Sequence, residues 1–116
     1  DKARAACAEA LDFGSLDAAE AKGAHAASYA CGRVLAVIAA RAWSSSGSVA
    51  EFWRDFIARA DRAGGYSAAL FFDMIAERAG PDFALEARAF PHTIYAAPAD
   101  ALQSLLDGAR PASAAP

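Results

Sequence analysis

The chain has 116 residues, a net charge of −3 and an isoelectric point of about 5.2, and 35 of its residues are alanine. This length allows one compact domain. The acidic balance excludes the basic surface of a nucleic-acid-binding domain, whose isoelectric point would exceed about 9. The longest apolar run, residues 34–40, is far shorter than the roughly 20 residues that cross a bilayer, so no membrane span is predicted.

The first residue of the chain bears on its origin. The first residue is Asp1 rather than methionine, so we expect a processed chain or a part of a longer protein. A processed chain would no longer carry a signal segment, so the sequence leaves the compartment open.

Cys7 and Cys31 are the two cysteines, and their spacing matches neither a metal-ligand pattern nor a C-x-x-C redox motif. The residues alone leave two interpretations open. The cysteines form a disulfide in an oxidising compartment, or they are two buried free thiols that pack as small apolar side chains.

The first half of the chain has helical periodicity. Residues 1–11 are rich in alanine and predict a first helix, which Phe13-Gly14-Ser15 ends. Asp17 is predicted to cap a second helix that extends to about residue 42. Its second half, residues 34–40, is apolar on all sides, which indicates a central helix surrounded by others. Residues 43–47 then break the pattern with turn-forming residues.

The third predicted helix has the clearest boundaries. Ser48 and Glu51 match a capping box, in which the hydroxyl accepts from a free backbone N–H and the carboxylate reaches back. Gly64-Gly65 ends the helix, because glycine accepts the left-handed conformation found there. Apolar residues recur at helical spacing on one predicted face: Val49, Phe52, Trp53, Phe56, Ile57 and Ala60.

Three shorter helices complete the predicted fold. Ser67 caps a fourth helix that Gly80-Pro81 ends, and Asp82 caps a fifth that extends to about residue 89. Residues 90–95 are expected to be extended, and Pro98 suits the first turn of a sixth helix. The fold prediction is therefore an all-α, compact bundle of about five to six helices without a sheet. It forms a single domain over residues 1–109, followed by a disordered tail over residues 110–116.

The sequence offers no complete catalytic or metal-binding set. Neither His25 nor His92 has a partner four residues on, and no H-E-x-x-H motif is present, so no metal site is predicted in this chain. His25 is interpreted as a helix-surface residue and His92 as a loop residue. The arginines are spaced singly among acidic residues, so no phosphate-binding stripe is predicted.

One stretch of the sequence indicates more than the fold, because it resembles a motif of a known family. Tyr29-Ala30-Cys31-Gly32, leading into the apolar helix, resembles the Y-x-x-G signature of gluzincin zinc metallopeptidases of the aminopeptidase N and glycyl-aminopeptidase classes. The following order is also similar: a small-residue break, an aromatic amphipathic helix, a Gly-Tyr-Ser helix start with Phe71-Phe72, and Glu77-Arg78-Ala79-Gly80. The resemblance covers residues 5 to 90. It implies the helical C-terminal part of such a catalytic domain.

The resemblance assigns roles to two residues. Tyr29 corresponds to the family tyrosine whose hydroxyl donates a hydrogen bond to the tetrahedral intermediate, while zinc activates water and polarises the carbonyl. Gly32 is implied to let neighbouring backbone approach closely and so keep that hydroxyl aimed at the metal. The zinc ligands would lie before Asp1 in a longer parent protein, so this chain alone would neither bind zinc nor hydrolyse peptides.

The chain also departs from the family pattern. Ala30 and Cys31 replace the charged residues usual between the tyrosine and the glycine, which leaves open a parent that kept the fold and lost activity. Members with a cysteine at this point imply extracytoplasmic (periplasmic or secreted) bacterial proteins, which agrees with a Cys7–Cys31 bridge. A cytoplasmic location is the alternative.

Two hypotheses of function follow. In the first, the chain is the C-terminal helical domain of a metallopeptidase and its partner is the N-terminal part of that parent. In the second, it is a stand-alone helical interaction module that binds another protein or forms a homodimer through an exposed apolar face. The position of Tyr29 discriminates between them. A hydroxyl exposed on a concave or partner-facing surface favours the peptidase hypothesis, and one buried in the bundle favours the interaction module.

Overall fold

The computed structural model describes residues 2–12, 14–44, 46 and 48–112. Over these residues the chain forms α-helices joined by short connections, together with one 3₁₀ turn and no strand, which confirms the predicted all-α bundle. The elements are α1 (Lys2–Leu11), α2 (Leu16–Ala21), α3 (His25–Trp43), α4 (Val49–Ala63), α5 (Ala68–Ala79), α6 (Pro81–Ala89), η1 (Phe90–His92) and α7 (Pro98–Gly108).

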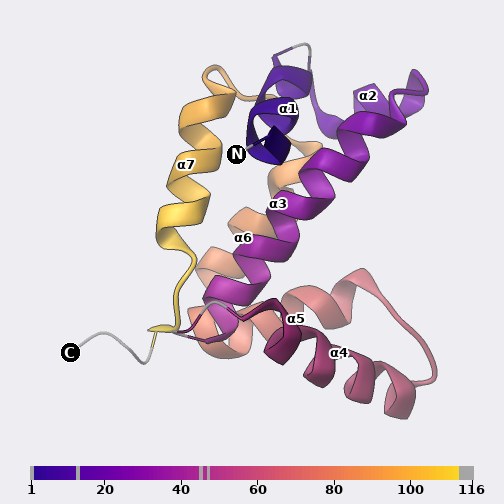
Figure 1. Ribbon diagram of the computed structural model, residues 1–116, viewed down its shortest axis with the longest axis vertical. Coiled ribbons are helices and arrows are strands. Elements are labelled where there is room, and N and C mark those ends of the chain that lie inside the picture. Colours follow the sequence, from indigo (N-terminus) through magenta and orange to yellow (C-terminus); the bar gives the residue numbers. More distant parts are fainter. Residues whose placement is uncertain (1, 13, 45, 47, 113–116) are drawn as a thin grey trace.

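Helix α3 is the central element. It packs against α1 and α2 near its N-terminal end, against α4 and α5 near its C-terminal end, and against α7 along its side (Figure 1). The predicted central position is confirmed on most sides of the apolar stretch. Val34, Ile38 and Ala39 are buried, whereas residues 35–37 are partly exposed. A helix that is apolar on all sides is stable only when other helices cover it.

The core consists of two clusters joined through shared neighbours. One lies between α1, α3 and α7 and includes Leu11, Ile38 and Leu102, and the other lies between α3, α4 and α5. Phe72 and Phe83 pack against both clusters, so the apolar interior is continuous from α1 to α7.

The predicted second helix is divided in two. The break falls at Gly23, whose φ of +83° only glycine adopts readily. Ser15, not Asp17, caps α2: its hydroxyl accepts a hydrogen bond from the Ala18 backbone N–H at 3.2 Å. Asp17 lies in the first turn of α2 instead, where its negative charge interacts favourably with the positive end of the helix dipole.

Helix α4 begins and ends as predicted. The Ser48 hydroxyl accepts from the Glu51 backbone N–H at 3.3 Å, and Gly64 adopts the left-handed conformation at the C-terminus. Only half of the predicted capping box forms among the described residues, because the Glu51 carboxylate accepts a hydrogen bond from the Ser46 hydroxyl at 3.1 Å instead of one from the Ser48 backbone N–H. Two members of the predicted apolar face, Val49 and Ile57, are exposed, because α3 and α5 cover only the part of that face that contains Phe52, Phe56 and Ala60.

Two predictions for the later helices are wrong in detail. Helix α6 begins at Pro81 with Gly80 at its N-cap, so Asp82 lies inside the first turn rather than capping the helix. Proline suits the first helical position because its fixed φ matches the helix and it lacks the N–H that would be unsatisfied there. Phe90–His92 form a 3₁₀ turn instead of an extended segment, since the turn places the Phe90 ring in the core.

The end of the chain is described only in part. Helix α7 extends from Pro98, in the predicted first turn, to Gly108, and Ala109 still packs in the core. Of the predicted disordered tail, residues 113–116 lie outside the described residues. Phe13, Ser45 and Gly47, from the two predicted turns, lie outside them as well.

Candidate functional site

Tyr29 is the residue on which the functional hypothesis depends. It lies in the second turn of α3, and its side chain is 77% exposed. The neighbouring residues Ala27, Ala30 and Cys31 are buried, so the opposite side of the same turn faces the core. The Tyr29 hydroxyl has no hydrogen-bond partner among the described residues, so the helix presents a free phenol on its outer surface.

Gly32 lies beside Tyr29, three residues further along the exposed side of α3. A Cβ atom added at Gly32 would meet nothing within 4 Å. The expected close approach of neighbouring backbone is therefore not made by the part of the chain that the structure describes. With Arg33, these residues form an uncovered strip on α3, which we call the Tyr29 strip (Tyr29, Gly32 and Arg33).

A carboxylate fixes the end of α3 that carries Tyr29. Glu20, at the end of α2, accepts a hydrogen bond from the Ser28 hydroxyl, and its Oε1 lies 3.1 Å from His25 Nδ1. The hydrogen bond from Ser28 and then the contact with His25 lower the pKa of Glu20 below its ordinary value. Both partners lie in the first turns of α3, where the helix dipole favours a negative charge. Glu20 thus ties α2 to the start of α3.

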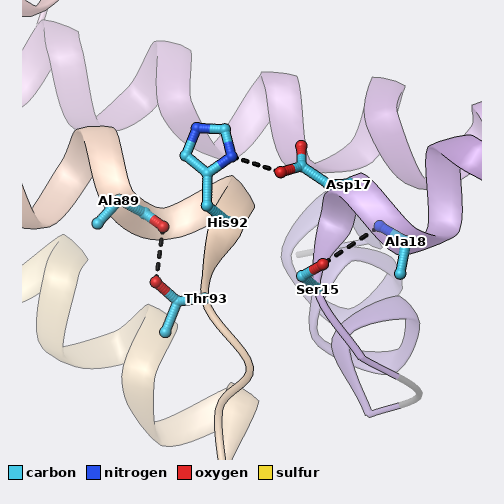
Figure 2. A network of polar contacts seen from close by, with 6 residues as sticks. All are labelled: Ser15, Asp17, Ala18, Ala89, His92 and Thr93. Carbon is cyan, nitrogen blue, oxygen red and sulfur yellow. Dashed lines mark hydrogen bonds and ion pairs between the residues drawn. The ribbon is translucent and has the colours of Figure 1, made fainter.

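The second histidine makes a corresponding contact at the other side of α2. His92 Nδ1 contacts the Asp17 carboxylate, which joins η1 to α2 across 75 residues of sequence (Figure 2). The Thr93 hydroxyl donates to the Ala89 carbonyl oxygen at 2.6 Å and holds the end of the turn (Figure 2). His92 was predicted as a loop residue, and neither interaction was predicted.

Cys7 and Cys31 form a disulfide, with their Cα atoms 4.8 Å apart, and both are fully buried. The bridge connects α1 to α3 two residues after Tyr29. Ala30, also between Tyr29 and Gly32, is buried as well. The two positions at which the resemblance expects charged residues therefore face the interior of this bundle.

The described residues offer no metal site. Among them, no group of three or more His, Cys, Asp and Glu side chains is placed to hold a metal ion. The gluzincin resemblance places the zinc ligands before Asp1, outside these residues.

Comparisons with protein-family models, with curated proteins and with solved structures found no match for this chain. In a separate search of the described residues, no helix had both the length and the apolar character needed to cross a membrane.

Proposed function

We propose that the chain is the C-terminal helical part of a gluzincin-type zinc metallopeptidase, and that it contributes Tyr29 to a metal centre built by upstream residues of a longer parent. The observation that carries the proposal is the exposure of Tyr29, whose phenol lies on the outer surface of α3 and is 77% exposed. A tyrosine packed within the bundle could not reach a substrate held by another part of the parent.

The role proposed for Tyr29 is that of a hydrogen-bond donor. When water adds to a peptide carbonyl, negative charge develops on the carbonyl oxygen. A phenol O–H placed beforehand near that oxygen stabilises the charge without having to reorganise. A neutral phenol can donate this bond, and the Tyr29 hydroxyl is not engaged by any described residue.

The support of Tyr29 is consistent with this role. The Cys7–Cys31 disulfide and the Glu20 contacts hold the first turns of α3 on both sides of the tyrosine. A donor must be positioned to within a fraction of an ångström to act on a transition state, and rigid elements do this better than loops. The disulfide also favours an extracytoplasmic location in a bacterium, because such bonds persist in oxidising compartments.

Gly32 is the proposed point of close approach between this chain and the upstream part of the parent. Its surface is uncovered in this chain, and a close neighbour there would have to come from the upstream part of the parent. The Tyr29 strip is therefore the proposed contact between this chain and the remainder of the peptidase.

The test is made on the full encoded protein. The proposal expects an H-E-x-x-H motif upstream of Tyr29, one bound zinc ion per protein by elemental analysis, and peptide hydrolysis that a chelator abolishes. Zinc without hydrolysis would identify a parent that kept the site and lost activity. If the encoded protein has no such motif and binds no zinc, the peptidase proposal fails, and a stand-alone helical interaction module becomes the better account.

A further inference from the structure

A groove lies between α1, α3 and α7, next to the Tyr29 strip, with which it shares Arg33. Its volume is about 550 Å³, within the range of small-molecule sites. Val34 and Val37 of α3 and Leu106 of α7 supply its apolar surface. The groove could therefore hold the apolar body of a small molecule between three helices that the core already fixes.

Basic side chains concentrate at this groove although the whole chain is acidic. The lining includes four of the 11 lysines and arginines, in a chain of net charge −3: Lys2 and Arg4 of α1, and Arg33 and Arg41 of α3. One carboxylate, Asp107 of α7, is present, and it accepts a hydrogen bond from the Gln103 amide at 2.7 Å. A concave surface lined mainly by one sign of charge attracts ligands of the opposite sign.

Lys2, Arg33 and Arg41 have donors available to bind an anion. Neither Lys2 nor Arg33 has an ion-pair partner among the described residues. Arg41 donates one bond, at 3.4 Å, to the Leu106 carbonyl oxygen, which leaves most of its five N–H donors available. Arg33 and Arg41 lie eight residues apart on α3, about 12 Å along the helix axis. This spacing suits a ligand with more than one acidic group.

We propose that this groove binds a small organic polyanion, with its acidic groups (phosphates or carboxylates) on the basic side chains and its apolar part against Val34, Val37 and Leu106. The sequence predicted no anion-binding stripe because the basic residues are spaced singly. The packing of α1 against α3 brings them together. The proposal shares Arg33 with the Tyr29 strip, but none of the observations behind it depends on the metallopeptidase hypothesis.

The test is isothermal titration calorimetry on the full encoded protein at low salt, with tripolyphosphate and citrate as separate probes. We expect at least one probe to bind, and Arg33→Ala to weaken that binding about tenfold or more, the usual cost of losing a charged hydrogen bond. Asp107→Asn should strengthen the same binding a few-fold by removing a repulsive charge. Preference for one probe distinguishes a phosphate ligand from a carboxylate ligand.

The matched control is Arg54→Ala. Arg54 is an exposed arginine on α4 that does not line the groove, so its removal should leave the affinity unchanged. Circular dichroism of each variant verifies the fold. The proposal is overturned if neither probe binds, or if Arg33→Ala and Arg54→Ala weaken binding equally, which would indicate only non-specific attraction to surface cations.

Discussion

Cys7 and Cys31 are bonded to each other at the point where α1 crosses α3, and neither is accessible to solvent. The bond closes a loop of 24 residues that contains α2 and the Glu20 contacts, and Tyr29 lies just inside it. The turn of α3 that presents the candidate functional phenol is thus tied to α1 by a covalent bond and to α2 by hydrogen bonds.

The disulfide predicts a large loss of stability when it is removed. Replacing both cysteines by alanine should lower the free energy of unfolding by about 3 kcal/mol, because the open chain gains conformational freedom when unfolded. Urea denaturation measures this loss. A reductant should destabilise the wild-type protein and leave the double variant unchanged. Two titratable thiols in the denatured, unreduced protein would contradict the account.

The Glu20 contacts predict a stability change at acid pH. The pKa of Glu20 is lower in the folded protein than its ordinary value of 4.5. The ionised carboxylate therefore stabilises the fold at any pH above 4.5. This stabilisation is lost as the pH falls below 4.5 toward the folded-state pKa. Glu20→Gln should therefore reduce stability at pH 6 and make less difference at pH 3. Denaturation curves of both proteins at the two pH values provide the measurement, and an equal difference at both would contradict the prediction.

Two glycines should respond in opposite directions to the same substitution. Gly32→Ala should stabilise this chain by about 0.5–1 kcal/mol, since the site is helical and nothing lies near the added methyl group. Gly64→Ala should destabilise it by about 1 kcal/mol, because Gly64 has a φ of +84°. Thermal unfolding of the two variants tests both signs.

Gly32→Ala also separates the two hypotheses of function. If the parent's backbone approaches Gly32 closely, as proposed, the same substitution should impair the full encoded protein while it stabilises this part of it. If Gly32→Ala stabilises the full encoded protein and leaves its activity unchanged, no part of the parent approaches Gly32 closely, which contradicts the proposal.

The elements that could be predicted from sequence are those that local chemistry decides. Ser48 and Ser67 accept hydrogen bonds at helix starts, and Gly64 accepts a conformation that other residues resist. Each of these effects operates within one helical turn. The central position of α3 was also predictable, because an apolar stretch such as residues 34–40 is stable only when other helices cover most of it.

The elements that could not be predicted depend on distant partners. Gly23 costs a helix only about 1 kcal/mol, so the sequence could not decide whether the helix breaks there. Phe90 turns inward because the core has room for its ring, which no local pattern indicates. The contact between Asp17 and His92 joins residues 75 positions apart.

The sequence indicated one part of the candidate sites, Tyr29, and did not indicate the other, the basic groove. The motif around Tyr29 singled out the residue, and its exposure follows from the helix face on which it lies. The basic groove was missed, because Lys2, Arg33 and Arg41 lie on two helices whose packing the sequence does not specify.

The most direct test of the functional proposal is the turnover number of the full encoded protein with Tyr29→Phe. Loss of the phenol hydroxyl should lower kcat about 100-fold or more and leave KM nearly unchanged, because the bond to the developing oxyanion forms in the transition state. Tyr66→Phe is the matched control, since Tyr66 is a similarly exposed tyrosine (69%) between α4 and α5. A Tyr29→Phe protein that hydrolyses peptides as fast as the wild type would contradict the proposal.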